Sequence, residues 1–437
     1  MSPRDIPRTI PTELTDRILV AMTPICEMMI QLEAEFDHGL DPDRLYRAVR
    51  LALDAEPVLG CRFADDGRDP QWERLDDGAL RKLFVSTGST EEFEAFKNEE
   101  HDLLNGPQFR LCHLSASGGD RILLKVNHEA ADAGGTKEIA GVISGIYSRL
   151  RDDPSYVPEP NLNGSRSYRQ INEKIPLKAF PTVAANYLKE CIRNNIPIKT
   201  RAMYMHPGKA DRPSYIVRQI EGLDFWKMAA YGRARGATIN DMLLAAFFTA
   251  LRDLGRDGGD SCMRVVTTVD LRRYLAEKKG AGICNLSALE PYKLNRDHAD
   301  DFETTLRKVV EMTGKRKSSW PGLAGFLLLS PILRIISYAS LKKSIVKFVE
   351  RGYSRHSLGS ALTNMGPIPV SCVEFDKAPR RAWLYVPPAR NPGFIMGISG
   401  FEEMITLTSG VYDTGTQYSM AVSFIEKMVG SIPISKQ

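Results

Sequence analysis

Residues 121–141 read RILLKVNHEAADAGGTKEIAG, a strand pattern that passes directly into a helix pattern. Side chains alternate between the two faces of an extended strand, so Ile122, Leu124, Val126 and His128 share one face. Asp132 follows four residues later, and a double glycine opens the helix pattern. An apolar face therefore ends on a histidine at a strand-to-helix junction, where a polar side chain can meet solvent or a second lobe.

Strand and helix patterns continue towards the N-terminus of this stretch. LDPDRLYRAVRLALDAEP (40–57) has apolar residues at helical spacing, and VLGCRF (58–63) is typical of a short strand. TEEFEAFKNEEHDLL (90–104) indicates an acidic helix, and FRLCHL (109–114) pairs with RILLKV through a turn rich in Gly, Ser and Asp. The sequence predicts an α/β fold with mixed sheets.

The clearest linker is RDDPSYVPEPNLNGSRS (151–167), which is rich in Pro, Asn and Gly. A chain of 437 residues is too long for one compact core, so we expect an N-terminal lobe over 1–165 and a C-terminal lobe over 166–437. In the second lobe Thr238 and Asp241 predict a capping pair before a buried helix. Strands are predicted at SYIVRQIEG (214–222), MRVVTTVDLRR (263–273), the segment around Asn364, ARNPGFIMGISGF (389–401), MITLTSGV (404–411) and YSMAVSFI (418–425).

Bulk composition excludes several classes of protein. The net charge is +4, from 58 basic and 54 acidic side chains, which gives no field that favours nucleic acid. Seven cysteines without a C-x-x-C argue against disulfides and zinc and favour a reducing compartment, so we expect a cytoplasmic protein without a metal. The apolar segment 322–341 is broken by Pro331 and Arg334, and it predicts a buried or lid-like helical pair. Peripheral membrane contact is the alternative, which is not expected.

His-x-x-x-Asp by itself is a weak signal. Asp132 suits a helix cap and His128 a hydrogen-bonded core histidine just as well. The neighbouring motifs are more specific. NHEAADAGG resembles the H-H-x-x-x-D-G signature of the chloramphenicol-acetyltransferase-like superfamily, the thioester-dependent acyltransferases that include condensation domains and alcohol acyltransferases. HDLLNGPQFRLCHL (101–114), RGATINDMLLAAFFTALR (235–252), TTVDLRR (267–273) with GICN (282–285), and TNMGPIP (363–369) resemble further family segments in the same order.

Three departures from the family patterns are visible. Asn127 replaces the first histidine of the signature, and by strand alternation it points away from the His128 face. Ala133 occupies the position at which the family has glycine, and the first glycine of this chain, Gly134, comes one residue later. This difference affects the backbone conformations open to the loop, because only glycine accepts positive φ without cost. The D-F-G-W-G segment of the plant branch is absent.

The resemblance implies two chloramphenicol-acetyltransferase-like lobes with an active-site tunnel between them. His128 would be the general base, and Asp132 would hold its loop by pairing with Arg272, or failing that Arg273, in a bidentate contact. Asn127 and Gly134 would support the site. Thr363 and Asn364 are candidates for oxyanion or substrate contacts, with polar turn residues as the plainer interpretation.

The expected activity is transfer of an acyl group from a coenzyme A or carrier-protein thioester to a hydroxyl or amine. No cofactor is bound permanently, since the acyl-CoA or phosphopantetheinyl donor is a substrate. The chain has no G-x-x-x-x-G-K or G-x-G-x-x-G loop, so scattered basic residues would have to bind the phosphates of coenzyme A. Lys315, Arg316 and Lys317 are candidates for these contacts. The plainer interpretation is that they form a solvated surface. The alternative is a non-catalytic relative that binds a carrier protein or acyl ligand.

Overall fold

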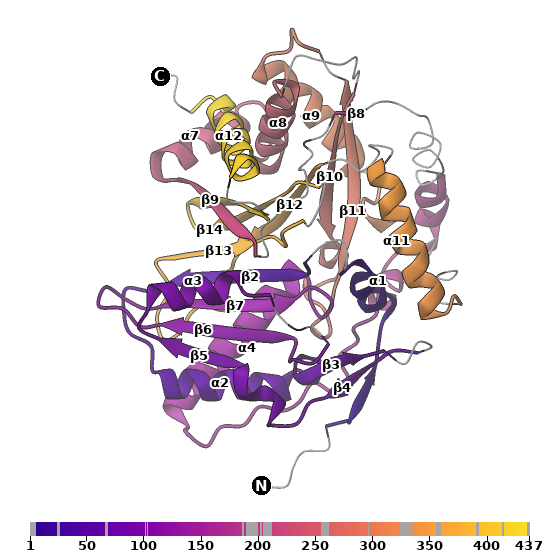
Figure 1. Cartoon of the computed structure of the whole chain (residues 1–437). Helices are drawn as coiled ribbons and strands as arrows, with labels where there is room; N and C mark the ends of the chain where they lie inside the picture. Colours follow the sequence, from indigo (N-terminus) through magenta and orange to yellow (C-terminus); the bar gives the residue numbers. More distant parts are fainter. Residues whose placement is uncertain are drawn as a thin grey trace.

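The computed structural model describes residues 6–23, 27–65, 69–100, 102, 104–185, 188, 200–201, 203, 212–254, 262–295, 297–317, 319–323, 333, 335–354, 360–389, 393–412 and 415–434, with the backbone alone at 81, 200–201 and 353–354. The chain forms two lobes, one above the other in Figure 1. Each lobe is a β-sheet covered by helices.

The N-terminal lobe carries a five-stranded sheet in the order β13-β2-β7-β6-β5 and a small sheet in the order β1-β4-β3. Helices α2 and α4 pack on one face of the larger sheet through an apolar core that includes Leu45, Val49, Leu124 and Ile139. The elements are β1 (Thr9–Pro11), α1 (Leu14–Met22), β2 (Met29–Glu35), α2 (Pro42–Ala55), β3 (Cys61–Ala64), β4 (Gln71–Arg74), β5 (Phe84–Thr87), α3 (Thr90–Asn98), β6 (Phe109–Leu114), β7 (Arg121–Asn127) and α4 (Ala133–Asp152).

The second lobe is built on a sheet in the order β11-β10-β12-β14-β15-β9, with β8 also paired to β10. Helices α8 and α12 share its main apolar core, where Phe247 packs edge-on against Phe424. The elements of this C-terminal part of the chain, of which β13 joins the N-terminal sheet, are α5 (Arg169–Asn172), β8 (Thr200–Arg201), β9 (Ser214–Glu221), α7 (Gly222–Arg233), α8 (Ile239–Arg252), β10 (Cys262–Asp270), the 3₁₀ turn η4 (Leu271–Tyr274), β11 (Ser287–Asn295), α9 (Phe302–Lys317), α11 (Tyr338–Ser354), β12 (Ser360–Pro367), β13 (Arg381–Tyr385), β14 (Ile395–Phe401), β15 (Met404–Val411) and α12 (Thr416–Ser431).

The two sheets are mixed, as the sequence predicted. Strands β10, β12 and β14 run parallel to one another and β8 is parallel to β10, whereas β11 and β15 pair antiparallel with β10 and β14. In the N-terminal sheet β13, from residues 381–385, pairs antiparallel with β2. Dividing the chain once, near residue 165, therefore does not assign each sheet to one continuous segment. The exact lobe boundary stays a prediction.

Several local predictions are confirmed. Strands β6 and β7 form the expected antiparallel hairpin. Helix α8 begins with a capping box in which the Thr238 and Asp241 side chains each accept a hydrogen bond from the other residue's backbone N–H, and the whole of 241–251 is buried. The predicted strand VLGCRF is shorter than expected, because residues 57–60 form a 3₁₀ turn and β3 begins at Cys61.

The predicted strand at YSMAVSFI (418–425) is wrong, because these residues lie in α12. The buried residues of this helix recur at spacings of three and four, and they are Ala421, Phe424, Ile425, Met428 and Val429. This is the 3.6-residue period, and it extends beyond the eight residues on which the strand was predicted.

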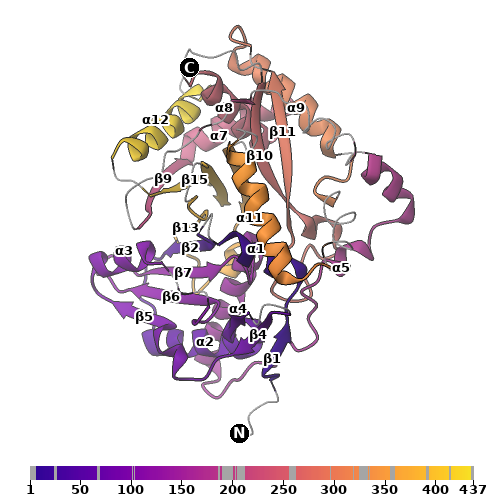
Figure 2. The same cartoon turned by 45° about the vertical axis from the view of Figure 1, so that its right-hand side comes forward.

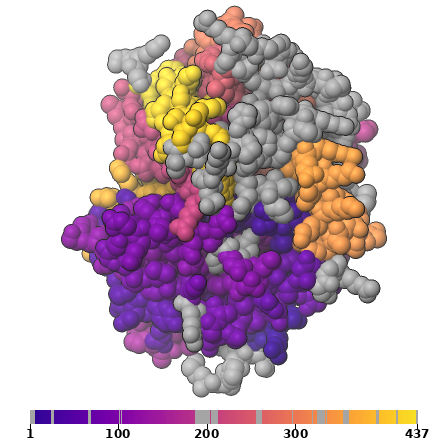
Figure 3. Space-filling view, in the orientation of Figure 1, coloured from indigo at the N-terminus to yellow at the C-terminus, as the bar shows by residue number. Residues whose placement is uncertain are grey.

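Helix α11 lies against α1 on the flank of the molecule (Figure 2), and Figure 3 shows it at the level where the lobes meet. The predicted helical pair at 322–341 falls largely on residues 324–332 and 334, which lie outside the described ones. In the part of the chain that the structure describes, no helix combines the length and apolarity needed to cross a membrane.

Candidate active site

His128 lies directly after β7, where the strand leaves the sheet. Its backbone N–H donates to the carbonyl of Met28 at 2.8 Å, and its ring is partly exposed. Nδ1 of the ring lies 3.0 Å from Oδ1 of Asn285, which comes from the second lobe just before β11. Within the described residues, Nε2 has no hydrogen-bond partner.

Asn285 fixes which ring nitrogen carries the proton. Its Nδ2 donates to the backbone carbonyl of Glu129 at 3.1 Å, so the opposite end of the amide, Oδ1, must face His128. A carboxamide oxygen can only accept, and Nδ1 of His128 is therefore the N–H donor. In the neutral imidazole this leaves the lone pair on Nε2.

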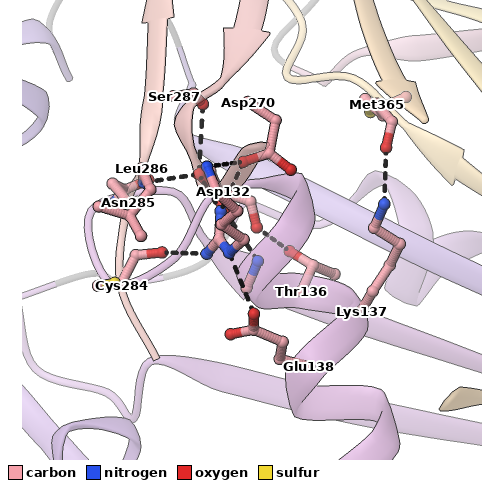
Figure 4. A network of polar contacts seen from close by, with 12 residues as sticks. Asp132, Thr136, Lys137, Glu138, Asp270, Cys284, Asn285, Leu286, Ser287 and Met365 are labelled. Carbon is pink, nitrogen blue, oxygen red and sulfur yellow. Dashed lines mark hydrogen bonds and ion pairs between the residues drawn. The ribbon is translucent and has the colours of Figure 1, made fainter. Parts of the chain in front are cut away.

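Asp132 caps α4 and is buried. Its Oδ1 accepts from the backbone N–H of Gly135 at 2.8 Å, and its Oδ2 accepts from the N–H of Leu286 at 2.7 Å and the hydroxyl of Ser287 at 3.3 Å. Oδ2 also accepts from Nη1 of Arg272 at 2.9 Å. Figure 4 shows this carboxylate between the start of α4 and β11.

Burial alone would raise the pKa of Asp132, but the Arg272 charge and the backbone donors hold it below its ordinary value. Both oxygens accept hydrogen bonds, so the carboxylate stays ionised and ties the two lobes together. No hydrogen bond joins it to His128 among the described residues.

Arg272, on η4, is the arginine that meets Asp132, and Arg273 is exposed instead. The contact is not the predicted bidentate pair, because the guanidinium divides its donors among four acceptors, with Nη1 also 3.4 Å from Oδ1 of Asp270. Nε contacts Glu138 at 3.0 Å, and Nη2 donates to the carbonyl of Cys284 at 3.0 Å. Arg272 thereby joins α4, η4 and the segment before β11.

Gly134 supports this arrangement through its lack of a side chain. A Cβ atom there would stand 2.6 Å from Nη1 of Arg272. Among the described residues neither Gly134 nor Gly135 has positive φ, and α4 begins at Ala133 directly after its cap. No residue at this position has to adopt a left-handed conformation, so Ala133 in place of glycine does not disturb the loop. What the first turn of α4 requires is space for Arg272, and Gly134 provides it.

Asn127 is buried away from His128, as alternation predicted. Its Nδ2 donates to Oε1 of Gln108 at 3.0 Å, and its side chain is 0% exposed. It lies inside the N-terminal lobe and does not face the second lobe's Asn285.

Thr363 and Asn364 lie on β12 and have no hydrogen bond to His128 or Asp132 among the described residues. Thr363 shares a hydrogen bond with Thr268 at 2.6 Å, and Asn364 donates to Asn240 at 3.0 Å. Lys137 links α4 to this strand by donating to the carbonyls of Met365 at 2.8 Å and Pro367 at 3.1 Å (Figure 4). Their role in the chemistry stays a prediction, as does the tunnel.

Comparison with known proteins identifies the fold. No protein-family model matches the chain. An uncharacterized protein of Mycobacterium tuberculosis, found in two strains, is 23% identical over 350 residues, which is 78% of this chain and 79% of that protein.

Solved structures match nearly the full chain. The TRI3 trichothecene 15-O-acetyltransferase from Fusarium sporotrichioides has a TM-score of 0.68 at 12% identity, covering 97% of this chain and 96% of its own. The first condensation domain of the CDA synthetase has a TM-score of 0.65 at 14% identity, with 98% and 96% covered. Polyketide synthase associated protein 5 from M. tuberculosis has a TM-score of 0.60 at 13% identity, with 97% and 99% covered.

The chain has the condensation-domain, chloramphenicol-acetyltransferase-like fold. The predicted fold class is thus confirmed, with two lobes and mixed sheets. In this condensation-like fold, His128, Asp132 and Gly134 come from the N-terminal lobe, whereas Arg272 and Asn285 come from the other.

Sequence reasoning missed Asn285, Lys137 and Glu138 as parts of this site. Asn285 had a usable signal, since GICN was already recognised as a family turn. The other two had none, because Lys137 and Glu138 follow Asp132 on an ordinary polar helix face and find their partners more than 130 residues away.

The basic cluster 315–317 at the end of α9 is only partly free for a ligand. Lys315 pairs with Glu311 at 2.6 Å, and Arg316 pairs with Glu290 at 3.0 Å. Lys317 lies 3.7 Å from Asp241, a distance that makes a weaker ion pair.

Proposed function

We propose that the protein is an acyltransferase that moves an acyl group from a coenzyme A or carrier-protein thioester to a hydroxyl or amine. The observation that carries the proposal is the tautomer of His128. With the proton on Nδ1 donated to Asn285, Nε2 is a base with a free lone pair on a partly exposed ring. A base in this position suits proton removal from an acceptor.

The chemistry needs no covalent enzyme intermediate. Nε2 of His128 takes the proton of the acceptor as its oxygen or nitrogen attacks the thioester carbonyl carbon, which gives a tetrahedral oxyanion. The carbonyl re-forms as the carbon–sulfur bond breaks, and the leaving thiolate takes the proton back from Nε2. Asn285 stabilises the imidazolium between these steps, because its Oδ1 accepts from Nδ1 throughout.

Asp132 and Arg272 act as positioning residues in this proposal. Their ion pair, together with the contacts to Leu286 and Cys284, fixes the position of the His128 loop relative to the segment that carries Asn285. Thr363 and Asn364 are proposed as oxyanion or substrate contacts. A carrier protein is the proposed partner when the donor is not free coenzyme A, in line with the fold shared with the condensation domain of the CDA synthetase.

Release of free thiol tests the proposal. Purified protein is incubated with a panel of acyl-CoA donors and with small alcohols and amines, and the thiol is monitored with and without acceptor. His128→Ala should lower the acceptor-dependent rate about a hundredfold or more. His298→Ala, at an exposed position, is the matched control and should leave the rate unchanged. Equal rates in wild type and H128A would contradict the role of His128. No turnover with any donor, carrier-bound donors included, would favour the non-catalytic alternative.

A further inference from the structure

A small basic and aromatic cavity lies beside η4, outside the His128 site. It has a volume of about 250 Å³ and is lined by Arg273, Tyr274, Lys317 and Trp320. These four described residues include two cations and two aromatic rings and no carboxylate. The lining favours a ligand that carries both negative charge and a flat ring.

Both cations are available to a ligand. Arg273 is exposed and has no ion-pair partner among the described residues, with its guanidinium 5.7 Å from the centre of the Tyr274 ring. Among the described residues Lys317 has one ion-pair partner, Asp241 at 3.7 Å, which is longer than a hydrogen bond. The Lys317 side chain is 51% exposed, so its ammonium can still reach a ligand.

The aromatic wall is held in an unusual conformation. Trp320 has φ +56°, in the left-handed region that a bulky side chain rarely occupies. Its ring stacks on Tyr274 with centroids 5.6 Å apart. Such a conformation is strained and persists only where the surroundings enforce it.

The turn that carries Trp320 is fixed from several sides. The backbone N–H of Gly322 donates to Oε2 of Glu290 at 3.0 Å, while Oε1 of Glu290 pairs with Arg316. Gly322 has φ +81°, and a Cβ there would lie 2.9 Å from Leu271. The hydroxyl of Tyr274 donates to the carbonyl of Pro321 at 2.9 Å. The surroundings therefore hold the indole in place as a preformed platform.

We propose that this cavity binds the phosphorylated adenosine end of coenzyme A, with the base against Trp320 and phosphate between Arg273 and Lys317. The inference rests on the proposed acyl transfer and chooses coenzyme A over a carrier-protein arm as the donor. A pantetheine arm carries phosphate but no ring, so it would leave the aromatic wall unused. The cavity is smaller than the ~300 Å³ at which drug-sized pockets begin, so it takes one end of the donor only.

The cavity adjoins the proposed active site in sequence. Arg273 directly follows Arg272, whose guanidinium holds Asp132. A ligand on Arg273 therefore binds one residue away from the contact that fixes the His128 loop.

Binding of coenzyme A, 3′-dephospho-coenzyme A and 4′-phosphopantetheine, measured by calorimetry without an acceptor, tests the inference. Coenzyme A should bind about tenfold or more tightly than phosphopantetheine. Arg273→Ala and Lys317→Ala should each weaken coenzyme A about tenfold, the scale of one lost charged hydrogen bond, and leave phosphopantetheine unchanged. Arg307→Ala, at an exposed position on the same helix and outside the cavity, is the control that should change nothing.

Trp320→Asn tests the platform separately. Asparagine tolerates the left-handed region, so the turn should fold while the ring is lost and coenzyme A binding weakens. Equal affinity for coenzyme A and phosphopantetheine, or coenzyme A binding that is unaffected by R273A and K317A, would overturn the inference. These measurements do not depend on His128, and H128A should bind coenzyme A as wild type does. Transfer from acyl-coenzyme A with an unchanged KM in R273A and K317A would overturn the cavity proposal and leave the acyltransferase proposal standing.

Discussion

The guanidinium of Arg272 lies over Gly134 so closely that a Cβ atom on the glycine would stand 2.6 Å from Nη1 and 2.8 Å from Cζ. Arg272 cannot move aside without cost, because its nitrogens contact Asp132, Glu138 and the Cys284 carbonyl. Gly134, two residues after the His-x-x-x-Asp segment, therefore makes room for the contact between the lobes.

Gly134→Ala should destabilise the protein by about 1–3 kcal/mol, as overpacking does, and should disturb the Asp132–Arg272 pair. Chemical denaturation measures the loss. Gly145→Ala is the matched control on the same helix, because nothing lies within 4 Å of its added Cβ and alanine favours the helix by roughly 0.5–1 kcal/mol. A G134A protein as stable as G145A would show that the close approach is not needed.

Asn285→Leu should allow the proton of neutral His128 to occupy either ring nitrogen. Leucine cannot accept from Nδ1, so the proton is no longer held there and the rate of acyl transfer should fall about tenfold or more. Nitrogen-15 NMR of the imidazole reads the tautomer directly and needs no substrate. Asn364→Leu should leave the imidazole spectrum unchanged, since its side chain contacts Asn240 instead. A persistent Nδ1–H signal in N285L would contradict the assignment.

Glu129→Gln should make the protein more stable at high pH. Burial raises the pKa of Glu129 from 4.5 to about 8, because the hydrogen bonds that favour the charged form offset little of this effect. Within the described residues the Oε2 atom of Glu129 has no hydrogen-bond partner. A raised carboxyl pKa means that the folded state holds a proton that the unfolded state loses above pH 4.5. The contribution of Glu129 to stability is therefore complete below pH 4.5 and is lost as the pH rises through about 8.

The neutral amide of E129Q removes this dependence. The free energy of unfolding of E129Q minus that of wild type should grow by about 1.4 kcal/mol for each pH unit between 4.5 and about 8, the interval in which the folded state keeps the proton that the unfolded state has lost. Urea unfolding at several pH values measures it. A difference that stays constant over this range would show that Glu129 is already ionised in the folded protein.

Local features were predictable because they depend on residues close together in the chain. Alternation placed Asn127 opposite His128, and the spacing of Thr238 and Asp241 predicted the cap of α8. The miss at 418–425 has a local cause as well, since an eight-residue window of β-branched and aromatic residues hides a helical period that Met428 would have revealed.

The sequence by itself determined the α/β class, the strand-to-helix junction that carries His128 and Asp132, and the likeness to a two-lobed acyltransferase. Only the tertiary structure decided that Asn285, 157 residues away, orients the imidazole, that Arg272 divides its donors among four acceptors, and that β13 joins the sheet of the first lobe. The reason is physical. Backbone periodicity is set by neighbours along the chain, whereas the contacts of a side chain between lobes depend on how the two sheets and their helices pack in space.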